Sequence, residues 1–120
     1  MSTIYFMRHA TPVSESDWQG SDETRPLSEQ GKKQATKLAI PSVAKIFVSP
    51  AKRAQETAIL AGIENFETFS PLWERMDDWL LSEMKKAVES VDGNVLFIGH
   101  QGSFAQVLKT EPGGVVVVKF

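Results

Sequence analysis

The stretch TIYFMRHAT, residues 3–11, decides the fold of this chain. Its first five residues form an unbroken run of β-branched, aromatic and long apolar side chains, which is typical of a strand buried on both faces. Arg8 and His9 end that run, so two groups able to carry positive charge come where the strand should end. Ligands of open α/β sheets bind outside the carboxyl ends of the strands. The stretch therefore predicts a central strand with a ligand site at its end.

The stretch NVLFIGHQG, residues 94–102, repeats this arrangement near the other end of the chain. Residues 95–98 have the composition of a second buried strand, and His100 follows them directly, with Gly102 two positions later. The chain has only two histidines. Both come just after such a strand, which indicates that they serve the same site.

The remaining segments alternate between helical and strand patterns. Ser28 is the expected N-cap of a helix that ends before Pro41, and Asp77 or Asp78 is the expected cap of the longest helix, which ends near Gly93. Residues 12–26 are expected to form a surface loop and residues 72–75 a connection. The other expected elements are strands at 46–48, 66–69 and 115–118, a helix at 51–61 and a short helix at 103–109. This order predicts a three-layer α/β/α sandwich with a mostly parallel sheet and an antiparallel C-terminal strand.

Length and composition restrict the possible functions. We expect residues 1–120 to form a single domain, since 120 residues with 42% hydrophobic and 23% charged side chains are typical of one soluble domain. A net charge of −2 argues against nucleic acid or anionic lipid as a partner. No apolar run approaches the ~20 residues of a membrane helix, and a cytoplasmic location is expected. The absence of cysteine excludes thiolate nucleophiles and thiolate metal sites.

Arg8, His9, Arg53, Glu74 and His100 together suggest phosphoryl transfer. The transferred phosphoryl group carries negative charge on its equatorial oxygens, which two guanidinium groups and an imidazolium could stabilise without a metal. A neutral imidazole can act as the nucleophile, and a carboxyl group can protonate the leaving oxygen and later activate water. The alternative of a zinc ion held by the two histidines and Glu74 is disfavoured because the nearby arginines would repel it.

These residues lie in four motifs that resemble those of the histidine phosphatase superfamily, which includes the cofactor-dependent phosphoglycerate mutases. The four matches follow the family order and span almost the whole chain. They are RHAT at residues 8–11, PLSEQGKKQA at 26–35, SPAKRAQETA at 49–58 and GHQG at 99–102.

The resemblance implies a role for each matching residue. His9 would be the nucleophile that accepts the phosphoryl group, and Arg8 and Arg53 would bind its oxygens. His100 would stabilise the transition state, and Gly102 is assigned with these residues to phosphate binding. Glu74 would be the proton donor, although Asp77 or Asp78 could reach the same space. Family members need no metal or organic cofactor, so none is expected here.

Two departures from the family pattern bear on the kind of site that is expected. Ala10 replaces the usual glycine of the first motif, and the segment from Glu74 to Asp78 lacks the long insertion that covers the site in larger members. An open site is therefore expected, as in the small bacterial phosphohistidine phosphatases, which the chain resembles in size. The sequence predicts a metal-independent phosphatase acting on a phosphorylated small molecule or a phosphoprotein. The alternative is a phosphate-binding or interaction module that has lost turnover; the oligomeric state is not indicated.

Overall fold

A five-stranded sheet forms the centre of the protein. The computed structural model describes residues 2–74, 77–100 and 110–118. The strands lie in the order β3-β2-β4-β1-β5, and β5 alone among them is antiparallel to its neighbour, β1. Their bounds are β1 Ile4–Arg8, β2 Lys45–Val48, β3 Glu67–Thr68, β4 Val95–Gly99 and β5 Val115–Val117. The mostly parallel sheet with an antiparallel C-terminal strand is confirmed.

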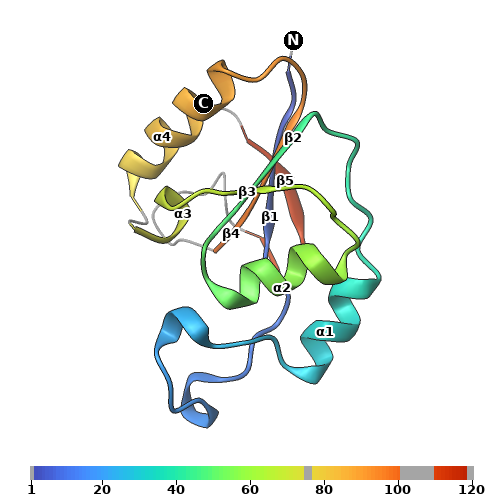
Figure 1. Ribbon diagram of the computed structural model, residues 1–120, viewed down its shortest axis with the longest axis vertical. Helices are drawn as coiled ribbons and strands as arrows, with labels where there is room; N and C mark the ends of the chain where they lie inside the picture. The colour runs from blue at the N-terminus through green and yellow to red at the C-terminus, as the bar shows by residue number, and fades with distance from the viewer. Residues whose placement is uncertain (1, 75–76, 101–109, 119–120) are drawn as a thin grey trace.

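Helices cover both faces of this sheet (Figure 1). On one face, α3 and α4 pack their apolar side chains, including Leu72 and Met84, against Phe6 and Phe97. On the other face, the small residues of α2 pack against a cluster that includes Met7. The helices are α1 Glu29–Thr36, α2 Lys52–Leu60, α3 Pro71–Glu74 and α4 Asp78–Glu89, with 3-10 turns η1 Glu15–Asp17 and η2 Asp22–Thr24. The expected three-layer α/β/α architecture is therefore confirmed.

The helix α1 packs against α2 beyond the carboxyl ends of the strands (Figure 1). Ser28 is its N-cap, as expected, because its Oγ accepts a hydrogen bond of 3.0 Å from the backbone N–H of Gly31. Leu27 and Ala35 are buried with Ala10 in a small cluster of their own. This cluster ties α1 to the segment that follows β1.

Several boundaries differ from the sequence expectations. The expected connection at 72–75 includes a single helical turn, α3, because Pro71 suits a first helical position and the N–H of Glu74 reaches the Ser70 carbonyl at 3.2 Å. The loop 12–26 contains the two 3-10 turns, and α4 ends at Glu89, before Gly93. Asp77 is the cap of α4. The helix expected at 103–109 lies outside the described residues, and none of the helices in the described part of the chain could cross a membrane.

Candidate functional site

The strand register brings the ends of β1, β4 and β2 to one edge of the sheet. Arg8 pairs with Gly99 and Val48 pairs with Ile98, so all three strands end at the same level. The backbone N–H of His9 then donates to the Gly99 carbonyl at 3.0 Å. The N–H of Ser49 donates to the Ile98 carbonyl at 2.9 Å. The residues that follow these strands therefore start from adjacent backbone positions.

The rings of His9 and His100 lie edge to face at this edge of the sheet. Their centroids are 5.0 Å apart and their planes are inclined by 62°. The Nδ1 atom of His9 lies 2.7 Å from the Ala10 carbonyl oxygen. A carbonyl oxygen can only accept a hydrogen bond, so Nδ1 carries the proton in the neutral ring. Nε2 of His9 then keeps its lone pair, as a nucleophile requires.

His100 is held by the opposite nitrogen of its ring. Its Nε2 atom lies 2.8 Å from Oγ of Ser49, a fully buried side chain at the end of β2. Its Nδ1 atom is buried, and no hydrogen-bond partner for it occurs within the described ranges. Buried polar atoms normally have a partner, so a bare Nδ1 is a candidate contact for a ligand oxygen.

Both histidines have pKa values well below that of a free imidazole. Burial is the largest cause, and it lowers the pKa of His9 to about 4, with further lowering by the charges of Arg53, Arg8 and Arg25. Burial, the charge of His9 and the charge of Arg53 lower the pKa of His100 to about 3. Both rings are therefore neutral at pH 7 in the ligand-free protein. The imidazolium expected from the sequence requires a bound anion to raise the pKa of His100.

Arg53 lies in the first turn of α2 and is almost fully buried. Its Nη1 donates to the Asp22 carbonyl at 2.7 Å and its Nη2 to Oδ2 of Asp22 at 3.2 Å. The guanidinium carbon lies 5.2 Å from the centroid of the Trp73 ring, a distance typical of a cation–π contact. The same Trp73 ring lies 5.2 Å from the His100 ring. Trp73 therefore links Arg53 and His100, which come from different strand ends.

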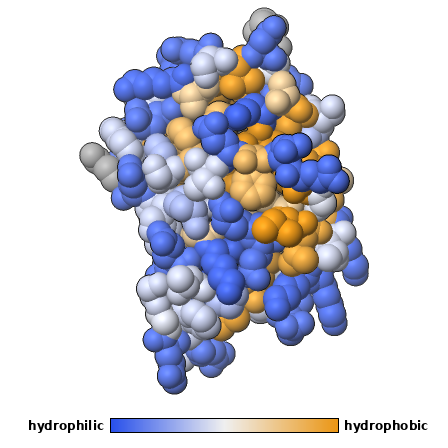
Figure 2. All heavy atoms as spheres, in the orientation of Figure 1, coloured by the Kyte–Doolittle hydropathy of each residue, from blue (hydrophilic) through white to orange (hydrophobic). Residues whose placement is uncertain are grey.

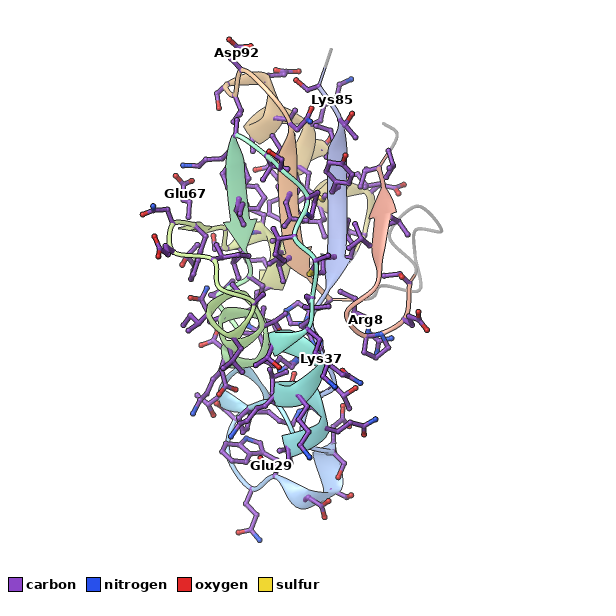
Figure 3. All side chains as sticks on the ribbon, turned by 90° about the vertical axis from the view of Figure 1, so that its right-hand side faces the viewer. Arg8, Glu29, Lys37, Glu67, Lys85 and Asp92 are labelled. Carbon is purple, nitrogen blue, oxygen red and sulfur yellow. The ribbon has the colours of Figure 1, made fainter. Side chains whose placement is uncertain are left out.

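Arg8 lies at the same edge, on the side of β5. Its backbone pairs with Gly99, and its Nη1 donates to the Thr110 carbonyl at 3.3 Å. Figure 3 shows Arg8 at the carboxyl end of β1, beside the segment that leads into β5. Its charge contributes to the lowered pKa of His9, so the guanidinium acts on the same ring.

The other motif residues hold the backbone around His9. Oγ1 of Thr57 accepts a hydrogen bond from the Ala10 N–H at 3.0 Å and donates to the Arg53 carbonyl at 2.7 Å. Gly31 approaches the chain so closely that a Cβ atom there would lie 1.9 Å from the Thr11 carbonyl oxygen. The methyl group of Ala10 is buried in the small cluster beneath α1, which accommodates this departure from the family glycine.

Two residues of the site, Asp22 and Arg25, were missed in the sequence. Arg25 is 8% exposed, and its Nε donates to Oδ1 of Asp22 at 3.0 Å. Its charge lowers the pKa of both His9 and His100, so it acts on the same site. The available signal was its position: Arg25 is the single basic residue of an acidic loop, directly before the PLSEQGKKQA motif.

The remaining predicted site residues are Glu74, Asp77, Asp78 and Gly102. Glu74 is exposed at the end of α3, next to Trp73, while Oδ1 of Asp77 caps α4 by accepting from the Trp79 N–H at 3.1 Å. Asp78 lies in the first turn of α4, and Gly102 lies outside the described residues. Within the described ranges, His9, His100 and Glu74 do not gather into a metal-binding group.

Comparisons with solved structures return proteins of the same fold. A candidate phosphohistidine phosphatase SixA of Nakamurella multipartitia is 27% identical, with a TM-score of 0.65 over 82% of this chain, which spans 59% of that protein. A candidate SixA of Agrobacterium tumefaciens is 18% identical, with a TM-score of 0.77 over 97% of this chain and 90% of that one. A phosphoglycerate mutase of Thermus thermophilus is 21% identical, with a TM-score of 0.72 over 98% of this chain and 93% of that one.

The family assignment comes from the sequence itself. No curated protein sequence matches the chain. The model of the histidine phosphatase superfamily (branch 1) matches residues 4–79, which are more than half of the chain and carry three of the four motifs. The family and the enzyme class predicted from the motifs are therefore confirmed, and this chain belongs to the histidine phosphatase superfamily.

Proposed function

We propose that this protein hydrolyses phosphorylated substrates through a phosphohistidine at His9. The proposal rests above all on the hydrogen bond from Nδ1 of His9 to the Ala10 carbonyl, 2.7 Å long, which leaves a lone pair on Nε2. The lowered pKa of His9 keeps that lone pair available at pH 7. Arg53 and Arg8 supply positive charge, and the bare Nδ1 of His100 offers a further hydrogen bond to a phosphoryl oxygen.

The reaction has two displacements. In the first, Nε2 of His9 attacks phosphorus, the bond from phosphorus to the leaving group breaks, and the leaving group takes up a proton. In the second, water attacks the phosphohistidine, the bond from phosphorus to Nε2 breaks, and phosphate leaves. Glu74 is the proposed proton donor because it follows Trp73, which contacts His100. Asp77 is a weaker candidate because one of its carboxylate oxygens already caps α4.

A phosphohistidine on a protein is the substrate class we favour. The SixA-named proteins among the structural neighbours support it, as does the short path between α3 and α4, where Glu74 and Asp78 are four positions apart. A site without a long insertion in that path leaves room for a protein-bound phosphoryl group. Small phosphate esters are the competing substrate class. The rates at which the protein hydrolyses a phosphoprotein and a phosphate ester distinguish the two classes.

The decisive experiment follows the fate of the phosphoryl group. Wild-type protein and the His9→Asn variant are mixed with an aryl phosphate and with a histidine-phosphorylated protein, and free phosphate is measured. The asparagine amide can still donate to the Ala10 carbonyl, so the variant removes Nε2 with little change elsewhere. We expect acid-labile phosphorylation of the wild type only, and at least a 1,000-fold loss of turnover in the variant, on the order of the loss of other catalytic nucleophiles. Equal rates would contradict the mechanism, and phosphate binding without turnover would favour an interaction module.

A further inference from the structure

Asp22 already accepts hydrogen bonds from the guanidinium group of Arg53, which the proposed mechanism assigns to the phosphoryl oxygens. Its backbone carbonyl accepts from Nη1 of Arg53, and its carboxylate accepts from Nη2 of Arg53 through Oδ2. The other carboxylate oxygen accepts from Nε of Arg25. A single carboxylate therefore bridges two guanidinium groups beside the two histidines.

The two arginines favour the ionised form of the Asp22 carboxylate. Burial alone would raise the pKa of Asp22, but the charge of Arg53 and the hydrogen bonds from Arg25 and Arg53 outweigh it and lower the pKa below its usual value. The charge of Asp22 also acts on His100. It raises the pKa of that ring, although burial and the nearby positive charges outweigh it. A phosphate dianion bound between Arg53 and His100 would thus meet a negative charge that is already in place.

The side chain of Asp22 has space into which it could move. It is 53% exposed, and it borders a cavity of about 310 Å³ that is also lined by Glu15, Trp18, Gly20 and Arg25. The lower end of the molecule, formed by residues 12–26, is largely hydrophilic on the face seen in Figure 2. Rotation toward this cavity would release Nη2 of Arg53, while the backbone carbonyl of Asp22 could keep its bond to Nη1.

We propose that the Asp22 carboxylate competes with phosphoryl oxygens for Nη2 of Arg53 and thereby determines how tightly the site holds phosphate. In the empty site the carboxylate accepts the hydrogen bond from Nη2 that a phosphoryl oxygen would otherwise accept. In the occupied site it is displaced toward solvent or repels the bound group. In either case it weakens the binding of the product phosphate and favours its release. This inference rests on the proposed assignment of Arg53 to the phosphoryl group.

The test measures phosphate affinity directly. Inorganic phosphate is titrated into the wild type, Asp22→Asn and Glu23→Gln at pH 7.5 and constant ionic strength, with calorimetric detection. Asparagine keeps the size of the side chain and removes its charge. Glu23→Gln removes one charge from the same turn, η2, and leaves both contacts from Asp22 to Arg53 in place. We expect Asp22→Asn to lower the Kd for phosphate about 3- to 10-fold, and Glu23→Gln to change it less than about twofold.

Weaker or unchanged binding by Asp22→Asn would overturn the proposal and make Asp22 a residue that orients Arg53 instead. Equal gains in both variants would also overturn it, because a general charge effect would then suffice. An absence of phosphate binding in all three proteins would exclude the anion site itself. The proposed hydrolysis is judged separately, by turnover in the wild type and His9→Asn. Asp22 could therefore limit binding even in a protein that does not turn over substrate.

Discussion

Oγ of Ser49 lies 2.8 Å from Nε2 of His100, and this contact joins the end of β2 to the residue that follows β4. The Ser49 hydroxyl also lies 3.3 Å from the Ala51 N–H, which can only donate to it. The hydroxyl hydrogen is not used in that contact, and its donation to Nε2 of His100 would leave the ring proton of His100 on Nδ1. Nδ1 has no partner in the described part of the chain, so in the proposed mechanism Ser49 would set the tautomer in which His100 donates to a phosphoryl oxygen.

Ser49→Ala should therefore reduce turnover through His100. Removing the hydroxyl frees the tautomer and the tilt of the ring, and we expect kcat to fall about 10- to 100-fold, as for a misplaced catalytic group. The partly buried Nε2 loses its partner, which should cost about 1 kcal/mol in the free energy of unfolding. Steady-state kinetics and urea unfolding measure the two effects. Ser70→Ala, at an exposed position before α3, is the control and should leave kcat unchanged.

Thr57→Val should impair the site through the backbone next to His9. The substitution keeps the shape of the side chain but removes the hydroxyl that accepts from the Ala10 N–H and donates to the Arg53 carbonyl. We expect a loss of about 1–3 kcal/mol in unfolding free energy and a fall in kcat, since the backbone next to His9 loses its support. Thr57→Ser retains the hydroxyl and should keep most of the activity. A serine variant as impaired as the valine variant would indicate that packing, not the hydroxyl, matters.

Trp73 should matter for anion binding because its ring contacts both Arg53 and His100. Trp73→Leu keeps an apolar side chain but removes the aromatic face, which is worth about 0.5–1 kcal/mol to a cation. We expect the Kd for inorganic phosphate to rise several-fold, and Trp73→Phe to lie between the leucine variant and the wild type. Calorimetric titration with phosphate provides the measurement. Identical affinities in all three proteins would show that the ring does not hold Arg53 in its binding position.

The sequence predicted the site wherever a residue follows a strand or lies in a helical first turn. His9 and His100 follow buried strands that pair in parallel, and Arg53 lies in the first turn of α2, which follows the neighbouring strand β2, so all three come to one edge of the sheet. The contact of Asp22 with Arg53 has no such pattern. It joins an irregular acidic loop to a helix 31 positions away, and neither periodicity nor capping rules address that distance. α3 was missed for a related reason, because four residues are too few to show helical periodicity.

Gly31→Ala should disrupt the site by moving α1. An added Cβ would lie 1.9 Å from the Thr11 carbonyl oxygen, which the backbone N–H and the side chain of Ser28 also contact. The helix must therefore shift, and we expect a loss of at least about 1–3 kcal/mol in unfolding free energy, as for other overpacked positions. Lys32→Ala, at the next position of the same helix, is the control and should stay within about 0.5 kcal/mol. A Gly31→Ala protein as stable as the control would contradict the close approach of α1 to Thr11.

Acid should destabilise the protein through its buried histidines. The pKa of His100 is lowered to about 3 and that of His9 to about 4, mainly by burial, whereas both would titrate near 6.5 in the unfolded chain. Between pH 6.5 and these folded-state values the unfolded chain binds protons that the native protein does not. The free energy of unfolding should therefore fall as the pH falls, by at most about 1.4 kcal/mol per unit for each ring.

The His100→Gln variant isolates one of these two contributions. A glutamine amide can replace Nε2 as the partner of Ser49, yet it does not titrate, so the unfolded variant takes up one proton fewer. We expect the decline in unfolding free energy between pH 6 and pH 4.5 to be shallower in the variant by about 1 kcal/mol per pH unit. Urea unfolding at several pH values within that range gives both slopes. Because every carboxylate of the chain is common to the two proteins, parallel slopes would mean that His100 is protonated as readily in the native state as in the unfolded chain.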